Sequence, residues 1–207
     1  MRYSTPAVIF EPRTHIYRTP AGKLVPSVTQ IIRGDKPTFY KDTGARERGV
    51  AIHKMTEAYE AGTLIPEYFS REVLGYLDPF KDFLASQNYK ELILSEAILS
   101  HCPFPGFMYA GIVDRIYLEQ DDTWVFLDIK TGKTYPPDTD LQLAAYVQAQ
   151  TLYSGTKVKR VCLRLSSEKW YKKEYPAEDL ELDTEVFNVR LRDWYSLNQP
   201  REDYELA

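Results

Sequence analysis

Two carboxylates and an amine in adjacent predicted strands are the residues best placed for chemistry. The stretch FLDIKTGK, residues 126–133, begins apolar and then sets Asp128 and Lys130 two residues apart. Alternate side chains of a strand point to the same face, so these two residues share one. A hairpin that turns near Asp121 would place Asp114 opposite or next to Asp128. The spacing therefore predicts a pair of carboxylates in a largely apolar sheet.

Such a carboxylate pair requires a compensating cation. Like charges directly opposite each other destabilise a sheet, and an unpaired buried charge is costly. Lys130 offsets only one carboxylate, whereas a divalent cation can offset the rest, because Mg²⁺ binds one or two carboxylates together with water and phosphate oxygens. Lys130 is then free to hold an attacking water or to stabilise charge on a phosphate. The three residues predict phosphodiester hydrolysis, with a surface salt-bridge cluster as the alternative.

Four further residues are candidates for the same site. Gln142 and Tyr146 lie one turn apart on a predicted helix and could contact a nucleotide, although the polar rim of an amphipathic helix explains them equally well. His53 lies among apolar neighbours on another predicted helix, where a lone histidine is more often structural than a ligand. Glu96 is a charge within an apolar predicted strand, LILSEAILS, and could face water instead.

Composition and charge set the class of protein. The chain has 207 residues, of which 43% are hydrophobic and 14% aromatic, enough for one domain with a packed core. The net charge of -4 does not indicate a nucleic-acid binder, so a polyanion would have to meet local basic groups such as Arg46 and Arg48. No apolar run approaches the roughly 20 residues of a membrane helix, and the N-terminus lacks a signal-peptide pattern. We therefore expect a cytoplasmic protein without a membrane partner.

Hydrophobic periodicity predicts a central sheet flanked by helices in the order α-α-β-β-β-α-β-β-α, an α/β or α+β domain spanning residues 1–207. Residues 1–37 are expected to be irregular or to form short strands, and the core to occupy about 27–175. The predicted helices are 43–61, 70–88 with a kink or restart at Pro79, 138–153 and 178–197. The predicted strands are 92–100, 109–119, 123–131, 157–167 and 169–176. Residues 198–207 are expected to form a frayed tail.

Taken in order, the site candidates resemble a known family. The resemblance covers about residues 27–165, and the ordered set is much more specific than any single motif. It is closest to the RecB-type branch of the PD-(D/E)XK nuclease superfamily, and in particular to small exonucleases of phage and prophage genomes, in which a segment like VPSVTQI precedes an R-G-x-x-x-H helix. The matching motifs are RGVAIH with His53, Glu96, G-x-x-D at 111–114, D-x-K-T-G at 128–132 and Q-x-x-x-Y at 142–146.

This resemblance implies a restriction-endonuclease-like core with a mixed central sheet, and Mg²⁺- or Mn²⁺-dependent cleavage of DNA. It implies His53, Asp114 and Asp128 as metal ligands, joined by Glu96 and the Ile129 carbonyl. In our hypothesis for the mechanism, Lys130 orients the attacking hydroxide, Gln142 and Tyr146 place the strand, and Arg46 and Arg48 bind flanking phosphates. The resulting hypothesis is an exodeoxyribonuclease of phage or prophage recombination or repair. Single- or double-stranded DNA ends are its expected substrate, and a recombination or single-strand-binding protein is a candidate partner.

Two departures from the family pattern refine the hypothesis. Val113 stands where the superfamily's name places proline, which this branch commonly tolerates. Some relatives hold an iron–sulfur cluster with four cysteines, and Cys102 and Cys162 are too few for one, so we expect no such cofactor. Two other functions remain open: a catalytically silent DNA-binding or assembly subunit, and a metal-dependent enzyme acting on RNA or another phosphate substrate.

Overall fold

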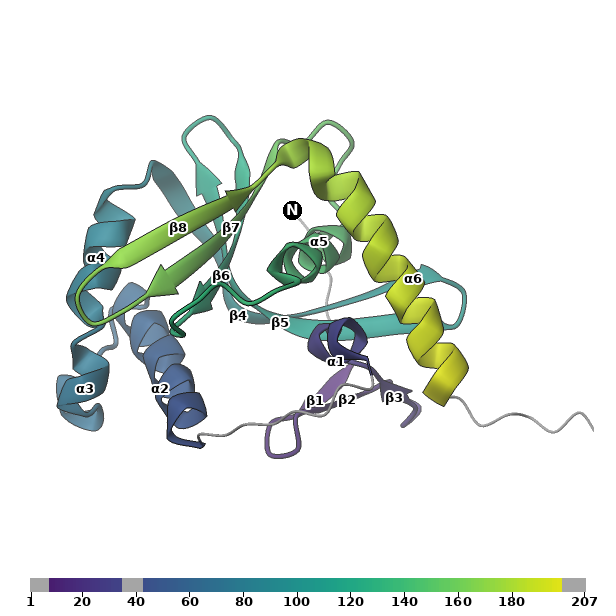
Figure 1. Ribbon diagram of the computed structural model, residues 1–207, viewed down its shortest axis with the longest axis horizontal. Coiled ribbons are helices and arrows are strands. Elements are labelled where there is room, and N and C mark those ends of the chain that lie inside the picture. Colours follow the sequence, from purple (N-terminus) through teal and green to yellow (C-terminus); the bar gives the residue numbers. More distant parts are fainter. Residues whose placement is uncertain (1–7, 35–42, 199–207) are drawn as a thin grey trace, which may run out of the picture.

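A five-stranded mixed sheet forms the centre of the molecule in the computed structural model, which describes residues 8–34 and 43–198 (Figure 1). The strand order follows the sequence; β6 and β7 are parallel, and the other neighbours are antiparallel. The strands are β4 (Tyr89–Phe104), β5 (Phe107–Glu119), β6 (Trp124–Lys130), β7 (Val158–Leu165) and β8 (Trp170–Tyr175). The predicted mixed sheet and both predicted hairpins, 109–131 and 157–176, are confirmed.

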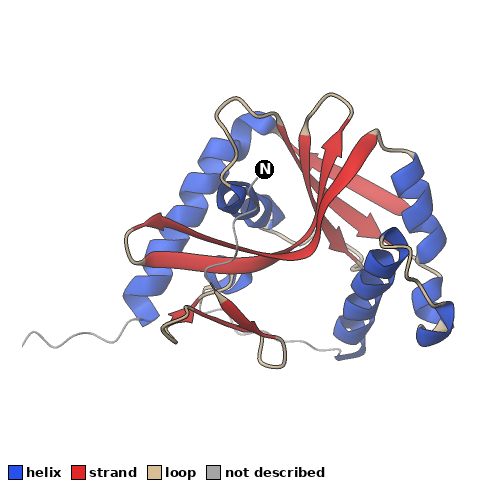
Figure 2. Ribbon diagram, turned by 180° about the vertical axis from the view of Figure 1, so that it is seen from behind, coloured by secondary structure: helices blue, strands red, loops and turns tan. Residues whose placement is uncertain are grey.

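Helices cover both faces of this sheet (Figures 1 and 2). One face carries α2 (Thr43–Glu60), α3 (Arg71–Leu74) and α4 (Leu77–Ala85), and the other carries α1 (Val28–Arg33), α5 (Thr139–Gln150) and α6 (Leu180–Asn198). Strand β6 shows how the sequence builds this sandwich, since Val125 and Leu127 pack toward α2 and α4 while Trp124 and Phe126 pack toward α5 and α6. Asp128 continues the second stripe and therefore lies on the α5 side.

The helix prediction for residues 70–88 is wrong in its detail. The segment forms two helices, α3 and α4, which are separated by Gly75 and Tyr76. Pro79 lies in the first turn of α4. A proline is tolerated there because the first backbone N–H groups of a helix have no acceptor within it. The predicted helices 43–61, 138–153 and 178–197 correspond to α2, α5 and α6, with a short 3-10 turn, η2 (Ala177–Asp179), before the last.

The N-terminal region contains short strands, one of the two outcomes predicted for residues 1–37, and a helix that was not predicted. Strands β1 (Ile9–Glu11), β2 (Ile16–Arg18) and β3 (Leu24–Val25) form a small antiparallel sheet, followed by the unpredicted helix α1. Ser27 and Gln30 begin that helix with a reciprocal capping box. Another 3-10 turn, η1 (Pro66–Tyr68), precedes α3. Of the predicted tail, 198–207, only Asn198 is among the described residues, where it ends α6. No described helix is long and apolar enough to span a membrane.

Candidate active site

The end of the β5–β6 pairing brings Asp114 and Asp128 together. The last paired residues are Arg115 and Leu127, so the same register sets Asp114 beside Asp128, as the hairpin predicted. Beyond that point a side chain connects the two strands, because Asp114 Oδ2 of β5 accepts a hydrogen bond from the Ile129 N–H of β6 at 2.6 Å. Both carboxylates are buried, and the β5–β6 pairing ends at this position.

Strand β4 adds a third carboxylate to this row. Ser95 pairs with Arg115 and Ala97 with Val113, which places Glu96 opposite Asp114. Glu96 has a φ of 44°, in the left-handed region that costs a non-glycine residue on the order of 1 kcal/mol or more. Such strain persists only where the surroundings hold the residue. Here Arg115 Nη1 donates to Glu96 Oε1 at 2.9 Å.

His53 on α2 is surrounded by acceptor oxygens. Its Nδ1 lies 3.1 Å from Glu96 Oε1 and 3.6 Å from Asp114 Oδ1, and its Nε2 lies 3.1 Å from the Ile129 carbonyl oxygen. Burial opposes a charge on this ring, but the nearby carboxylates, led by Asp114 and Glu96, outweigh burial and raise the pKa of His53 to about 9. At neutral pH the ring is therefore an imidazolium that donates from both nitrogens.

The same atoms have the chemistry of metal ligands. The ligand atoms of His53, Glu96 and Asp114 all lie within 4.8 Å of one another. Carboxylate oxygens and an imidazole nitrogen suit Mn²⁺, and the oxygens suit Mg²⁺. Burial raises the pKa of Asp114 to about 6, which His53 partly opposes, so this carboxyl is harder to ionise than an ordinary aspartate and a nearby cation would favour its charged form. A divalent ion thus fits these residues once His53 has lost its proton.

Lys130 links the carboxylates to α5. Its Nζ donates to Asp128 Oδ1 at 2.8 Å and to Gln142 Oε1 at 3.4 Å, and Gln142 Nε2 donates to the Tyr146 hydroxyl at 3.3 Å. Burial works against the charge of Lys130, but Asp128 and Asp114 outweigh it and raise the pKa, so Lys130 remains an ammonium. Asp128 itself lies outside the compact group of His53, Glu96 and Asp114.

Gly111 allows Tyr146 to approach the sheet. A Cβ at this position would lie 2.8 Å from Tyr146 Cε1 and 3.1 Å from its hydroxyl oxygen, closer than side-chain packing permits. Tyr146 is buried, so its ring has little room to move away. Because Gly111, the glycine of the G-x-x-D motif, has no side chain, Tyr146 and its partner Gln142 can pack close to β5.

The two predicted phosphate-binding arginines diverge. Arg46 lines the cleft that contains His53, Glu96 and Asp114. Arg48 instead donates to Glu72 of α3 at 3.1 Å and is not among the residues that line this cleft. The structure thus brings one of the two arginines to the site.

Arg115 and its hydrogen-bond partners, which hold Glu96 in place, were not identified from the sequence. Arg115 is fully buried and donates to Glu60 Oε2 at 2.6 Å, to Thr56 Oγ1 at 2.9 Å and to Glu96. Tyr117 donates to Glu60 at 2.5 Å. A signal was present, since Arg115 follows Asp114 in a strand and must point to the opposite face, where a buried guanidinium needs acceptors.

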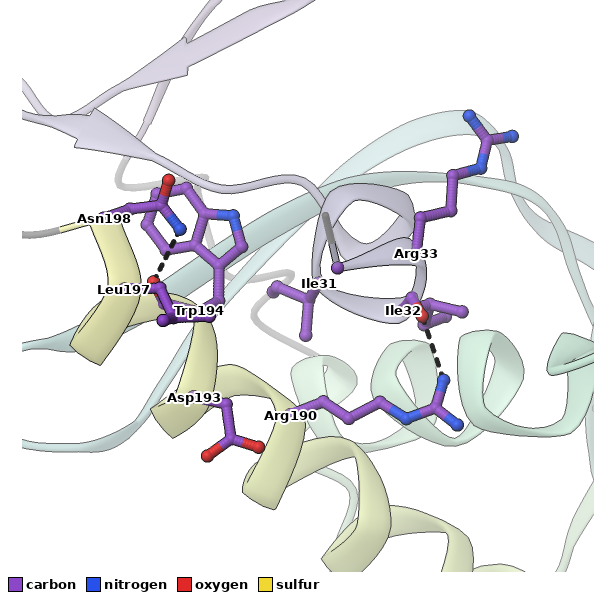
Figure 3. Close-up of a pocket in the computed structure, with 9 residues that line it drawn as sticks. Ile31, Ile32, Arg33, Arg190, Asp193, Trp194, Leu197 and Asn198 are labelled. Carbon is purple, nitrogen blue, oxygen red and sulfur yellow. Dashed lines mark hydrogen bonds between the residues drawn. The ribbon is translucent and has the colours of Figure 1, made fainter. Parts of the chain in front are cut away.

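Two cavities differ in their chemistry. The cleft over the site has a volume of about 580 Å³ and extends from His53, Glu96 and Asp114 to the β1–β2 hairpin. Another cavity, of about 370 Å³, lies between α1 and α6, where Ile31, Trp194 and Leu197 are prominent (Figure 3). There Arg190 donates to the Ile32 carbonyl at 3.0 Å. Among the residues lining this second cavity Asp193 is the only carboxylate, so it cannot supply a comparable ligand set.

A protein-family model matches the part of the chain that contains most of the site residues. Residues 90–205, more than half of the chain, match the family model described as the PD-(D/E)XK nuclease superfamily. The chain belongs to this superfamily. The superfamily match begins within β4 and includes Glu96, Asp114, Asp128, Lys130 and the α5 pair, while His53 and the N-terminal sheet precede it. No curated protein matches the chain in sequence.

Two solved structures are similar to this chain, and one of them supports the superfamily fold. The crystal structure of a protein named "Putative exonuclease", from Eubacterium rectale, has a TM-score of 0.52 at 11% sequence identity, and the match covers 85% of this chain and 83% of that one. The crystal structure of SSO0001 has a TM-score of 0.41 at 15% identity, covering 87% and 80%. The predicted restriction-endonuclease-like fold is confirmed by the superfamily match and the first of these structures.

Proposed function

We propose that this chain is a divalent-metal-dependent deoxyribonuclease that hydrolyses phosphodiester bonds from DNA ends. The observation that carries the proposal is the meeting of Asp114, Asp128 and Lys130 where the β5–β6 pairing ends, beside a cleft that also contains His53 and Glu96. Membership of a nuclease superfamily supports a nucleic-acid substrate. The exonuclease name of the similar Eubacterium rectale protein supports action from DNA ends over internal cleavage.

Mg²⁺ or Mn²⁺ would be held by His53, Glu96, Asp114 and the Ile129 carbonyl, with Asp128 as an additional ligand. The ion supplies positive charge that offsets the carboxylates and stabilises negative charge on the reacting phosphate. His53 has a second task, because its two N–H groups satisfy the same oxygens while the ring is protonated. These hydrogen bonds hold the Glu96 carboxylate and the Ile129 carbonyl in place before a cation binds.

Lys130 acts as a donor rather than as a base. Its raised pKa keeps the ammonium charged, so its N–H groups can hold the attacking water and stabilise charge on phosphate oxygens. Asp128 and Gln142 fix the position of this ammonium through the two hydrogen bonds described above. Gln142 and Tyr146 then contact the strand beside the scissile phosphate, and Arg46 binds a phosphate further along the cleft.

We further propose that this chain is a RecB-type exonuclease that acts in phage or prophage recombination or repair, in the bacterial host cytoplasm. The order of the His53, Glu96, G-x-x-D, D-x-K-T-G and Q-x-x-x-Y motifs supports this assignment. A recombination or single-strand-binding protein is the proposed partner, because a chain with a net charge of -4 gains little from long-range attraction to DNA.

The test uses end-labelled DNA. Linear single-stranded and double-stranded DNA, covalently closed circular DNA and RNA are each incubated with the protein and Mg²⁺, Mn²⁺ or EDTA. We expect metal-dependent degradation of linear DNA and survival of the circle. Lys130→Ala should lower the rate by about 100-fold or more, as expected for loss of a transition-state donor. Lys172→Ala, a change of the same kind on exposed β8, is the matched control.

The outcomes separate the alternatives. Binding without degradation would favour a silent DNA-binding subunit, and degradation of RNA alone would change the substrate class. Cleavage of the closed circle would overturn the exonuclease assignment while leaving the nuclease assignment intact. Full activity in Lys130→Ala would overturn the mechanism.

A further inference from the structure

The cleft extends from the carboxylates to an aromatic group on the β1–β2 hairpin. Phe10 and Tyr17 pair across the two strands, and their rings stack with centroids 4.7 Å apart. His15 contacts both rings edge-on, with centroid distances of 5.1 Å to Phe10 and 5.7 Å to Tyr17. All three residues line the same cleft of about 580 Å³ as His53 and Asp114.

This aromatic group is not simply a piece of core. Phe10 is only half-buried and His15 is exposed, with a φ of 55° that a histidine rarely adopts. Tyr17 is 1% exposed, and its buried hydroxyl has no hydrogen-bond partner among the described residues. A buried donor without an acceptor is unfavourable. A polar ligand group that reached this hydroxyl through the cleft would remove that deficit.

The hairpin is fixed relative to the carboxylates. Val8, Tyr17 and Val25 pack with Ala110, and the Ala110 N–H donates to the Pro26 carbonyl at 3.1 Å. Ala110 lies on β5, four residues before Asp114. The aromatic group and the carboxylate row are therefore attached to the same strand.

We propose that Phe10 and His15 form a stacking subsite for an unpaired nucleobase of the DNA strand, with the Tyr17 hydroxyl bonding that nucleotide. This inference rests on the proposed nuclease function and specifies its substrate. Aromatic side chains bind the flat faces of bases with little sequence preference. Bases inside a duplex are already stacked, so the strand must be single or frayed where it meets the hairpin. Arg46 and Lys54, on the α2 side of the cleft, lie along the path of the backbone.

The test measures binding in a Lys130→Ala background with Mn²⁺, so that cleavage does not consume the probe. A fluorescent single-stranded DNA carries one abasic position, which is moved along the strand, and anisotropy gives each Kd. We expect one or two adjacent abasic positions to weaken binding by about tenfold. Phe10→Leu, which keeps an apolar side chain in the hairpin, should weaken binding of intact DNA by a similar factor.

The decisive measurement combines the two changes. If Phe10 stacks on the missing base, Phe10→Leu and the sensitive abasic position together should weaken binding no more than either alone. His15→Asn, which tolerates the positive φ, should show the same pattern. Tyr68→Leu, at a residue that is 79% exposed and outside the cleft, is the control and should not change the profile. Thermal melting checks that each variant is folded.

Three results would overturn the subsite. A flat abasic profile shows that no base is held, and additive effects show that Phe10 acts elsewhere. Equal binding of blunt duplex and single-stranded DNA removes the need for an unpaired base. If the wild-type chain degrades linear DNA and any of these results is found, only the subsite fails. If the chain neither binds nor degrades any DNA, the nuclease proposal fails with it.

Discussion

Two charged clusters share strand β5 and differ in how fully their charges are matched. In the first cluster, Arg115 is surrounded by Glu60, Thr56 and Glu96, and every one of these contacts is a hydrogen bond between 2.6 and 2.9 Å. In the second, Asp114 and Asp128 lie close to Lys130 and the His53 ring, beside the cleft that Asp114 and His53 line. The first cluster is closed by its own side chains, whereas the second opens into a cleft.

Glu96 is the point at which the clusters meet. Its Oε1 lies 2.9 Å from Arg115 Nη1 and 3.1 Å from His53 Nδ1. The pKa of Glu96 is lowered because these two cationic groups outweigh the effect of burial. A satisfied buried network fixes one conformation, while a buried carboxyl with a raised pKa beside a cleft, as at Asp114, is typical of a ligand site. Arg115 therefore holds the open cluster in place without facing the cleft.

The largest effect should come from removing a charge in the open cluster. Asp114→Asn keeps the shape and can still accept from the Ile129 N–H, but it loses the negative charge that a cation needs. We expect nuclease activity with Mn²⁺ to fall by about 1,000-fold, because a metal ion contributes several kcal/mol to the transition state. Asp122→Asn makes the same chemical change at an exposed turn and should keep full activity. Comparable activity in the two variants would contradict the ligand role of Asp114.

Breaking the closed cluster should act on stability. Arg115→Met leaves Glu60 and Glu96 without their buried cation, so we expect the free energy of unfolding to fall by about 3 kcal/mol or more in urea titrations. Lys90→Met breaks the exposed Lys90–Asp122 pair, where the loss should stay below about 1 kcal/mol. Equal losses in the two variants would show that the Arg115 network does not stabilise the fold.

The smallest effect is a pH dependence of metal affinity. The pKa of His53 is about 9, above its ordinary 6.5, so below pH 9 the ring must release a proton before it can bind a cation. We expect the affinity for Mn²⁺, measured by calorimetry, to rise about tenfold per pH unit between pH 7 and 8.5. His53→Gln should bind more weakly and with a shallower slope. A slope in the wild type no steeper than in this variant would contradict the role of His53.

The raised pKa of His53 also affects the stability of the metal-free fold. Because the folded pKa of His53 lies above the ordinary value, its contacts stabilise the fold fully below about pH 6.5. That contribution is lost as the pH rises toward 9. Asp114, whose pKa of about 6 lies above its ordinary 3.8, adds a destabilising contribution that develops between these two pH values and is constant above them. Stability without metal should therefore decline from pH 6 to pH 9, as thermal melting can show.

Much of the core could be predicted because its signals are local. The alternation in FLDIKTGK and the turn at residues 120–122 were enough to set Asp114 beside Asp128, and the observed register agrees. The helix that carries His53 also ended near its glycine stop at Gly62. Side-chain period and turn position determine these features without reference to distant residues.

The N-terminal region shows the limit of local signals. Short strands were one of two predicted outcomes there, but β1, β2 and β3 have two or three residues each, too short for a period to set their bounds. Helix α1 has only six residues, although Ser27 and Gln30 carry a capping-box signature that was not recognised in the sequence. These elements are held by packing of Val8, Tyr17 and Val25 against β5, a contact between residues far apart in the chain.

Tertiary contacts also redirected side chains whose elements were predicted correctly. Asp138 occupies the N-cap position of α5, yet its carboxylate accepts from Arg190 of α6 at 3.1 Å and caps no helix N–H. Arg48 pairs with Glu72 of α3 and does not line the cleft. In each case a charged partner from another element binds the side chain.

The sequence by itself determined which residues carry the chemistry and the face on which Asp128 and Lys130 lie, because strand alternation and hairpin register are set within a few residues of the chain. Only the tertiary structure decided that His53, Glu96 and Asp114 form the compact group, that Arg115 holds Glu96 in place, and that the β1–β2 hairpin borders the same cleft. These arrangements depend on burial and on charge pairing between distant segments. No local pattern encodes them, because the energy of a buried charge depends on partners that only folding brings near.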